Sequence, residues 1–240
     1  MTTKISVIMP VYNRDYKNYL KLAIESVLNQ SFSDFEFIII NDASTDNTQE
    51  IIDQYKDIRI KSHTTTQNHG EYWATNFAVN LCQGEFLTWI HSDDIMSKDS
   101  LRLRYDALQN GTFDFVHGDI IKIDENGKEI GRLDSITWPK EEILSQYFTD
   151  PLQRKRIWII HHTSVMMRWN FFYKAGPFDA SLPFAGDIDW LIRAIKAGTF
   201  LYLPKVLYFY RFHNLARRVV DVKQGVNTDE IRDQIIRRYK

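Results

Sequence analysis

Residues 85–94 have the sequence EFLTWIHSDD, an apolar run that ends in two adjacent aspartates. Two earlier segments share this design: ISVIMPVYN in residues 5–13 and FEFIIIND in residues 35–42. Open α/β sheets bind their ligands beyond the carboxyl ends of the strands. If the three runs are parallel neighbours, they bring Tyr12, the pair Asn41-Asp42 and the pair Asp93-Asp94 to one edge of a sheet.

The segments between these runs have the spacing of amphipathic helices. Apolar residues repeat at intervals of three and four in Leu20–Leu28, and a helix is also expected over Glu71–Cys82. The polar residues 44–48 offer helix-capping side chains, so we expect a helix from there to about Tyr55 and then a strand over Ile58–His63. Strands that alternate with helices in this way indicate βαβ units and a parallel sheet. The pattern predicts an α/β fold over roughly residues 1–110.

The second half of the chain is less regular. The expected elements are strands over 113–119, 162–168 and 201–210 (the last interrupted at Pro204), a hairpin with an Asn-Gly turn in 120–128, and helices over 141–148, from about 169, and over 187–197 with Gly198 as the C′ residue. We divide the chain into residues 1–110, residues 111–213 of the same domain, and a charged helical tail over 214–240.

Bulk composition is that of an ordinary globular protein. The chain has 240 residues, 44% hydrophobic and 25% charged, with a net charge of -1. This balance gives no basic field for nucleic acid. Cys82 is the single cysteine, which excludes an intrachain disulfide and favours a reducing compartment. The N-terminus lacks a signal-peptide pattern and no apolar run is long enough to span a membrane, so we expect a cytoplasmic protein.

The polar ends of the three strands suggest a nucleotide bound through a metal ion. Asp93 and Asp94 supply hard oxygen ligands, which suit Mg²⁺ or Mn²⁺, but aspartates are equally common in helix caps and exposed turns. Tyr12 could stack on a base, and Asp42 could accept a proton from a base or a ribose. Alternatively, such loop residues satisfy local backbone groups.

Two features lie in the second half. Asp187, at the start of a helix, could act as a general base, although acids favour a helix N-terminus in any case. Asp189 is two residues further on and points elsewhere. His213 follows an apolar strand and could complete a metal shell, or it could be an exposed loop histidine. We assign no role to His117 or to the pair His161-His162. The chain contains no dinucleotide, P-loop or zinc motif.

Taken together, these segments resemble the family 2 glycosyltransferases of GT-A fold. The resemblance rests on seven ordered segments between Lys4 and about Asn214: residues 6–13, 26–32, 41–48, 68–76, 84–94, 176–193 and 210–213. It implies a Rossmann-like, mostly parallel sheet with helices on both faces. Residues 1–110 would then bind the nucleotide-sugar, and residues 111–213 would bind the acceptor and supply the base.

The resemblance also implies inverting transfer of a sugar from a nucleotide donor, usually UDP-linked, to a hydroxyl acceptor such as a saccharide or glycolipid, in bacterial-type surface polysaccharide or glycoconjugate assembly. Asp187 would be the base. Mn²⁺ or Mg²⁺ would be held by Asp93 and Asp94, with His213. The nucleotide-binding residues would be Pro10, Val11, Tyr12, Asn13, Asp42, Asn68, Gly70 and Asp93.

The chain departs from the family pattern at three positions. His91 stands where the metal motif often begins with Asp, Gly186 stands where a Glu commonly precedes the base, and Thr75 stands where an Arg is usual. Two alternatives therefore remain: a catalytically impaired sugar-nucleotide-binding module and a sugar-phosphate nucleotidyltransferase. The latter should carry a Gly-rich basic loop, and residues 10–14 (PVYNR) contain no glycine. The basic and apolar residues of the tail fit a helix on a membrane surface, an ordinary surface helix, or the lead into a further segment.

Overall fold

The computed structural model describes residues 3–133, 140–148, 160–216, 223 and 225–239. Its core is one mixed sheet of nine strands in the order β3-β2-β1-β4-β8-β6-β9-β5, with β7 paired to β6. The strands are β1 (Ile5–Val11), β2 (Phe35–Asn41), β3 (Ile60–Thr64), β4 (Phe86–Trp89), β5 (Ile95–Met96), β6 (Phe115–Ile123), β7 (Glu129–Leu133), β8 (Met166–Arg168) and β9 (Phe200–Arg211). This architecture confirms the predicted α/β class.

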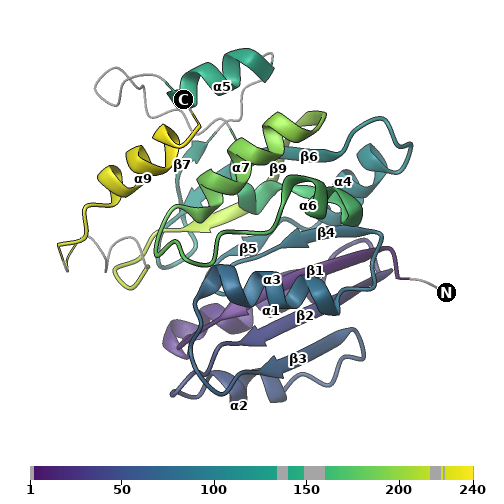
Figure 1. The fold of residues 1–240 in the computed structure, drawn as a ribbon. Coiled ribbons are helices and arrows are strands. Elements are labelled where there is room, and N and C mark those ends of the chain that lie inside the picture. Colours follow the sequence, from purple (N-terminus) through teal and green to yellow (C-terminus); the bar gives the residue numbers. More distant parts are fainter. Residues whose placement is uncertain (1–2, 134–139, 149–159, 217–222, 224, 240) are drawn as a thin grey trace.

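The first four strands are parallel, as their alternation with helices predicts. β1 pairs in parallel with both β2 and β4, and β3 extends β2 on its far side. The helices between them are α1 (Tyr19–Leu28), α2 (Thr48–Asp53) and α3 (Glu71–Leu81). Beyond β4 the sheet becomes mixed, because β8 runs antiparallel to both β4 and β6. Figure 1 shows this continuous sheet from β3 to β9.

Helices cover both faces of the sheet. Ile5, Val7 and Met9 of β1 are buried against the apolar stripe of α1, whereas Ile8 of β1 faces the small residues of α3. Figure 1 shows α3 in front of β1 and β2, and α1 behind them. The remaining helices are α4 (Ser100–Leu108), α5 (Lys140–Phe148), α6 (Trp169–Ala175), α7 (Gly186–Ala197) and α9 (Thr228–Arg237), with short 3-10 turns η1 (Tyr16–Asn18) and η2 (His162–Ser164).

Two sequence expectations are corrected in the second half. The segment 162–168 is a strand only from Met166, because Ser164 N–H and Val165 N–H bond back to the carbonyls of His161 and His162 and form a turn. Gly198 follows α7 with an extended backbone at φ -136 and is not a left-handed cap. A Cβ there would lie 2.4 Å from the Phe171 ring of α6, so this glycine lets α6 pack closely against the turn between α7 and β9.

The predicted interruption at Pro204 is a bulge inside one long strand. Gly118 of β6 pairs with Leu203 and Asp119 pairs with Val206, which leaves Pro204 and Lys205 outside the ladder. Pro has no N–H to give to a ladder, so a bulge accommodates it. The hairpin predicted near residues 120–128 is present, and its Gly127 adopts φ +85.

The C-terminal helix α9 packs on α7. Ile235 and Ile236 are buried with Ile188 and Ile192 of α7. These two isoleucines are therefore part of a small core and do not form an exposed apolar stripe toward a membrane surface. In the part of the chain that the structure describes, no helix combines the length and apolar character of a transmembrane span.

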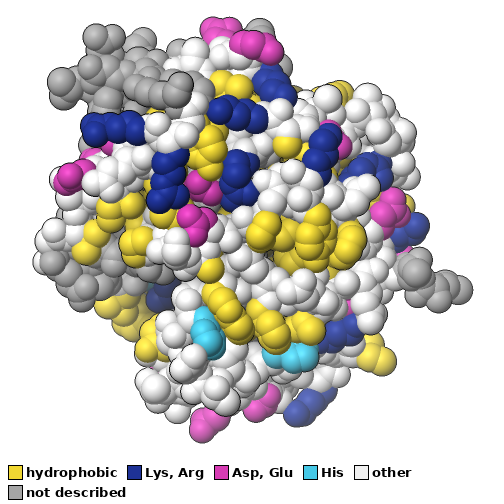
Figure 2. Space-filling model, in the orientation of Figure 1, with side chains coloured by type: hydrophobic (Ala, Val, Ile, Leu, Met, Phe, Trp, Pro, Cys, Tyr) yellow, Lys and Arg dark blue, Asp and Glu magenta, His cyan; other side chains and the backbone are white. Residues whose placement is uncertain are grey.

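On the face shown in Figure 2, basic and acidic side chains are interspersed, and apolar side chains gather along α3 and beside α6. The strip along α3 includes a stack of rings, with 4.0 Å between the centroids of His69 and Trp73 and 5.2 Å between those of Trp73 and Phe77.

Candidate active site

The carboxyl ends of β1, β2 and β4 meet at one edge, as the sequence predicts. The ladder pairs Val11 with Asn41 and Ile8 with Trp89, so the loops that follow these strands are neighbours. Tyr12 lies on the first loop with 45% of its surface exposed, and its ring is free for a ligand to stack on. Val11 is only 3% exposed and belongs to the core. Its carbonyl accepts from Asp42 N–H at 2.9 Å and so ties the end of β1 to the second loop.

Asn13 joins the first two loops. It adopts a left-handed backbone at φ 50, which Asn tolerates better than most residues. Its N–H donates to the Ser44 hydroxyl at 2.9 Å, and its side-chain oxygen accepts from Thr45 N–H at 2.8 Å. Asn13 thus holds the loop after β1 against the loop after β2.

Asp42 faces inward. Its carboxylate accepts hydrogen bonds from Thr65 Oγ1, His69 N–H and Gly70 N–H at 2.7–3.1 Å. Asn68 adds a bond from its amide to the Asp42 carbonyl. These bonds occupy the acceptor positions of both carboxylate oxygens. Asp42 therefore shapes the loop 65–70, which ends at Gly70 with φ +91 and opens into α3.

The adjacent aspartates Asp93 and Asp94 have different environments. Asp94 is buried and accepts from the Tyr208 hydroxyl at 3.0 Å and from Arg211 N–H at 2.7 Å. Burial and the charge of Asp93 raise the pKa of Asp94. Asp93 is more accessible, and its Oδ2 lies 3.0 Å from His213 Nε2 and 3.3 Å from Arg14 Nη2. Burial opposes the charge on Asp93, but His213 and Arg14 outweigh it and lower its pKa.

A second row of titratable side chains leads from this pair to α7. His91 Nδ1 lies 3.3 Å from Asp94 Oδ2, and His91 Nε2 lies 3.1 Å from Glu71 Oε1. The ring centroids of His91 and His162 are 5.1 Å apart. His162 Nδ1 in turn lies 3.4 Å from Asp187 Oδ2. The row therefore joins the metal-motif region to the residue that the sequence analysis assigned as the base.

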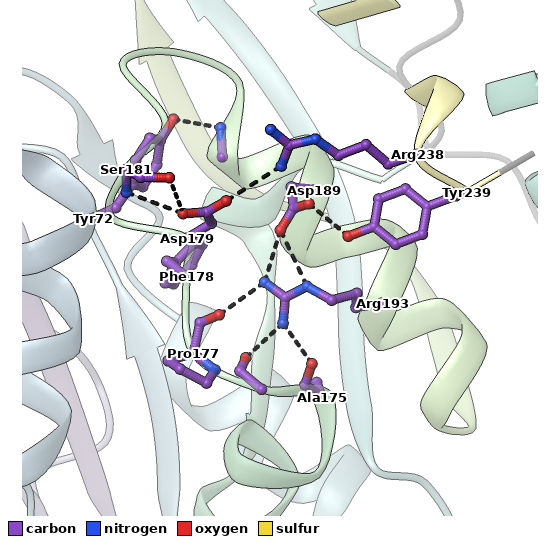
Figure 3. Close-up of polar contacts among 12 residues, drawn as sticks. Tyr72, Ala175, Pro177, Phe178, Asp179, Ser181, Asp189, Arg193, Arg238 and Tyr239 are labelled. Carbon is purple, nitrogen blue, oxygen red and sulfur yellow. Dashed lines mark hydrogen bonds and ion pairs between the residues drawn. The ribbon is translucent and has the colours of Figure 1, made fainter. Parts of the chain in front are cut away.

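Asp187 and Asp189 face different surroundings, as their spacing predicts. Burial opposes the charge on Asp187, but the His162 partner prevails and lowers its pKa to about 2. Asp189 is 3% exposed and binds Arg193 and the hydroxyl of Tyr239. Figure 3 shows Arg193 between Asp189 and the carbonyl groups of residues 175–177, which it reaches through three further bonds.

The three departures from the family pattern meet around one hollow. A small cavity is lined by Thr75, His91, Glu71, Tyr72 and His162, with aromatic walls. Gly186 borders the same place, because its N–H donates to the Tyr72 hydroxyl at 2.9 Å. A Cβ at Gly186 would lie 2.7 Å from the Tyr72 ring. Tyr72 therefore fills the space that a longer side chain at position 186 would need.

Sequence reasoning missed four residues of this region: Arg14, Glu71, Tyr72 and His162. Arg14 follows Asn13 directly, and Glu71 and Tyr72 follow Gly70. Because Asn13 and Gly70 were predicted site residues, their immediate neighbours could have been included in the prediction. His162 comes from a 3-10 turn in the irregular half. Nothing in its local sequence indicates that it lies beside Asp187.

Residues 6–176 match the model of the family described as Glycosyl transferase family 2. A glycosyltransferase of Rickettsia conorii is 30% identical over 218 residues, which are 88% of this chain and 34% of that protein. The chain spans between 19% and 50% of the length of four such relatives from Rickettsia species and Haemophilus influenzae.

Solved structures share the fold. Residues 1–349 of S. aureus TarS in complex with UDP superpose with a TM-score of 0.67 at 23% identity, over 97% of this chain and 69% of that one. The same protein has been solved with UDP-GlcNAc. The mannosyltransferase PcManGT of Pyrobaculum calidifontis, in complex with GDP-Man and Mn²⁺, gives 0.64 at 15% identity, over 94% of this chain and 61% of that one. These neighbours confirm the GT-A fold.

Proposed function

Because the chain belongs to glycosyl transferase family 2, we propose that it transfers a hexose or N-acetylhexosamine from a UDP-sugar to a hydroxyl group, with inversion at the anomeric carbon. The acceptor is a saccharide or glycolipid of a surface polysaccharide or glycoconjugate. The meeting of three strand ends beside Asp187 carries this proposal. The UDP and UDP-GlcNAc complexes of TarS support a uridine donor.

The donor binds over the loops that follow β1 and β2. Tyr12 stacks on the base with its exposed ring. Pro10, Val11 and Asn13 contribute through backbone shape, because the Val11 side chain is buried and the Asn13 side chain is bonded to the second loop. Asp42, Asn68 and Gly70 form the wall of this site through the hydrogen bonds that hold loop 65–70.

The donor set on the β4 side fits Mg²⁺ or Mn²⁺. Within the described residues the side-chain contacts of Asp93 all involve Oδ2, so Oδ1 is available as a ligand. Asp94 and His213 sit behind Asp93, and the ligand atoms of His91, Asp93 and Asp94 lie within 4.8 Å of one another. A divalent ion here would offset the negative charge of a departing diphosphate. Arg14 is a second cation beside the same carboxylate and faces the phosphates.

Asp187 takes the proton from the acceptor hydroxyl. The acceptor oxygen then attacks the anomeric carbon from the face opposite the diphosphate, and the bond between the sugar and UDP breaks. A single displacement of this kind inverts the anomeric carbon. With a pKa of about 2, Asp187 is ionised at neutral pH, and it can accept a proton once the hydroxyl approaches.

A UDP-release assay tests the proposal. UDP-, GDP- and dTDP-sugars are incubated with the protein in Mn²⁺ and, separately, in EDTA. The proposal requires slow UDP release from a UDP-sugar that EDTA abolishes and that Asp93→Asn weakens at least about 10-fold. Tight UDP-sugar binding without any turnover in Mn²⁺ would favour the binding-module alternative. Release of UTP from a UDP-sugar and pyrophosphate would favour a nucleotidyltransferase.

A further inference from the structure

A small cavity lies between α3, the end of β4 and η2. Its volume is ≈ 10 Å³, which is the lower limit for one water molecule. Three of its lining side chains can ligate a metal: the Glu71 carboxylate and the imidazoles of His91 and His162. One donor atom from each lies within 4.8 Å of the other two.

Each imidazole is oriented by a carboxylate on its far side. His91 Nδ1 faces Asp94 Oδ2 at 3.3 Å, and His162 Nδ1 faces Asp187 Oδ2 at 3.4 Å. This leaves the Nε2 atom of each ring on the opposite side. Metal-ligating histidines nearly always have such a carboxylate or carbonyl partner on the second nitrogen, because it fixes the tautomer and ring orientation.

His91 Nε2 lies 3.1 Å from Glu71 Oε1, an ion pair when the imidazole is protonated. The angle of this contact is not that of a hydrogen bond, so the buried Nε2 has no hydrogen-bond partner in the described residues. A nitrogen and an oxygen that share a tetrahedral ion at about 2.0–2.1 Å are separated by about this distance. The buried nitrogen and the cavity are independent observations that point to a ligand at the same place.

We propose that Glu71, His91 and His162 hold a Zn²⁺-class ion, separate from the divalent ion of the donor diphosphate. Two imidazoles, one carboxylate and an open fourth position are a donor set typical of Zn²⁺, and nitrogen ligands disfavour Mg²⁺. The ion ties α3 and β4 of the first half to η2 of the second. It also fixes His162 against Asp187. This site depends on neither UDP nor turnover, so it stands or falls separately from the proposed transfer reaction.

Binding to nucleotide-free protein tests the site directly. Chelator-treated protein is titrated with Zn²⁺ by calorimetry and with Co²⁺ by visible absorption, which is intense for a four-coordinate ion. We expect one ion per chain and a Co²⁺ spectrum of low coordination number. Crystals grown with Zn²⁺ should give an anomalous peak between Glu71, His91 and His162.

Variants locate the ion. Glu71→Gln and His162→Gln should each weaken Zn²⁺ by more than the roughly 10–100-fold that loss of an outer-shell partner produces. Asp187→Asn, which removes the carboxylate behind His162, should weaken it by about 10–100-fold. Asp93→Asn is the matched control and should weaken Zn²⁺ far less than Glu71→Gln, because Asp93 is a charged neighbour of His91 and not a ligand of this ion. Zn²⁺ should raise the melting temperature of the wild type and of Asp93→Asn by more than that of Glu71→Gln.

Three results would overturn the proposal: no binding of Zn²⁺ or Co²⁺ to the wild type, an anomalous peak at Asp93 with none between Glu71, His91 and His162, or an ion lost in Asp93→Asn but kept in Glu71→Gln. The crystallographic and wild-type titrations remain decisive even if a ligand variant fails to fold.

Discussion

Asp187 and Asp189 lie in the same turn of α7, but their side chains contact different residues. Asp187 faces His162 near the cavity, whereas Asp189 is held by Arg193 and Tyr239 behind the helix. Asp187→Asn keeps the shape and removes the basicity, so turnover should fall by roughly 10²–10⁴-fold, the usual range for a general base. Affinity for the UDP-sugar should change little, as measured by calorimetry.

Asp189→Asn is the matched control for that variant. It should leave the chemical step nearly intact and lower the free energy of unfolding by about 1.5–3 kcal/mol, because hydrogen bonds to a charged group are lost. Equal losses of turnover in the two variants would show that Asp187 is not the base.

Asp42 gives a second prediction at this scale. Its carboxylate holds the N–H groups of His69 and Gly70. Asp42→Ala should remove the hydrogen-exchange protection of these two amides and weaken UDP and UMP alike, by about 1–3 kcal/mol. If UDP affinity falls while both amides stay protected, Asp42 contacts the nucleotide itself and its bonds to the loop are secondary.

At the scale of elements, two polar contacts just after α9 add to its buried isoleucines. The Tyr239 hydroxyl donates to Asp189 Oδ1 at 2.5 Å, and burial together with that carboxylate raises the pKa of Tyr239 to about 12. Tyr239→Phe should lower the free energy of unfolding by about 1.5–3 kcal/mol in urea titrations. Arg238→Gln removes only the exposed pair with Asp179 and should change it by less than about 1 kcal/mol. A larger loss of unfolding free energy in Arg238→Gln than in Tyr239→Phe would show that the hydrogen bond between Tyr239 and Asp189 contributes little to stability.

The strand ends were predictable because they depend on local patterns. Apolar runs of four to seven residues that end in polar clusters place Tyr12, Asp42 and Asp93 at one edge without any knowledge of the packing. The direction of each side chain was not predictable in this way. Asp42 turns inward because the loop 65–70, far along the chain, presents N–H groups to it. Glu71 and His162 come together only in the folded chain, which no local spacing encodes.

At the scale of the whole molecule, His117 links stability to pH. It is fully buried in β6, and neither ring nitrogen has a hydrogen-bond partner in the described residues. Burial lowers the pKa of His117 to about 3, against a smaller opposing effect of Asp119. Below pH 6.5 His117 is protonated in the unfolded chain but stays neutral in the folded chain. The stabilising contribution of the neutral ring is therefore complete above this pH and is lost as the pH falls toward 3.

The expected slope is about 1.4 kcal/mol of unfolding free energy per pH unit between pH 6 and 4 from this group alone. His117→Leu should flatten the slope by that amount in denaturant titrations across this range. His63→Gln, at an exposed position, is the control and should leave the slope as in the wild type. An unchanged slope in His117→Leu would mean that the ring is hydrated in solution.

The return of β9 to the β4 edge has a consequence for the order of events during synthesis. Asp93 meets His213 across 120 residues of sequence, and Asp94 meets Arg211 across 117. At ~5–20 residues per second, the ribosome needs roughly 6–24 s to deliver those partners. Until then Asp94 has neither the Tyr208 hydroxyl nor the Arg211 N–H as a donor. The strands β1 to β4 can pair early, but the carboxylate turn between β4 and β5 is among the last parts of the nascent chain to reach its final conformation.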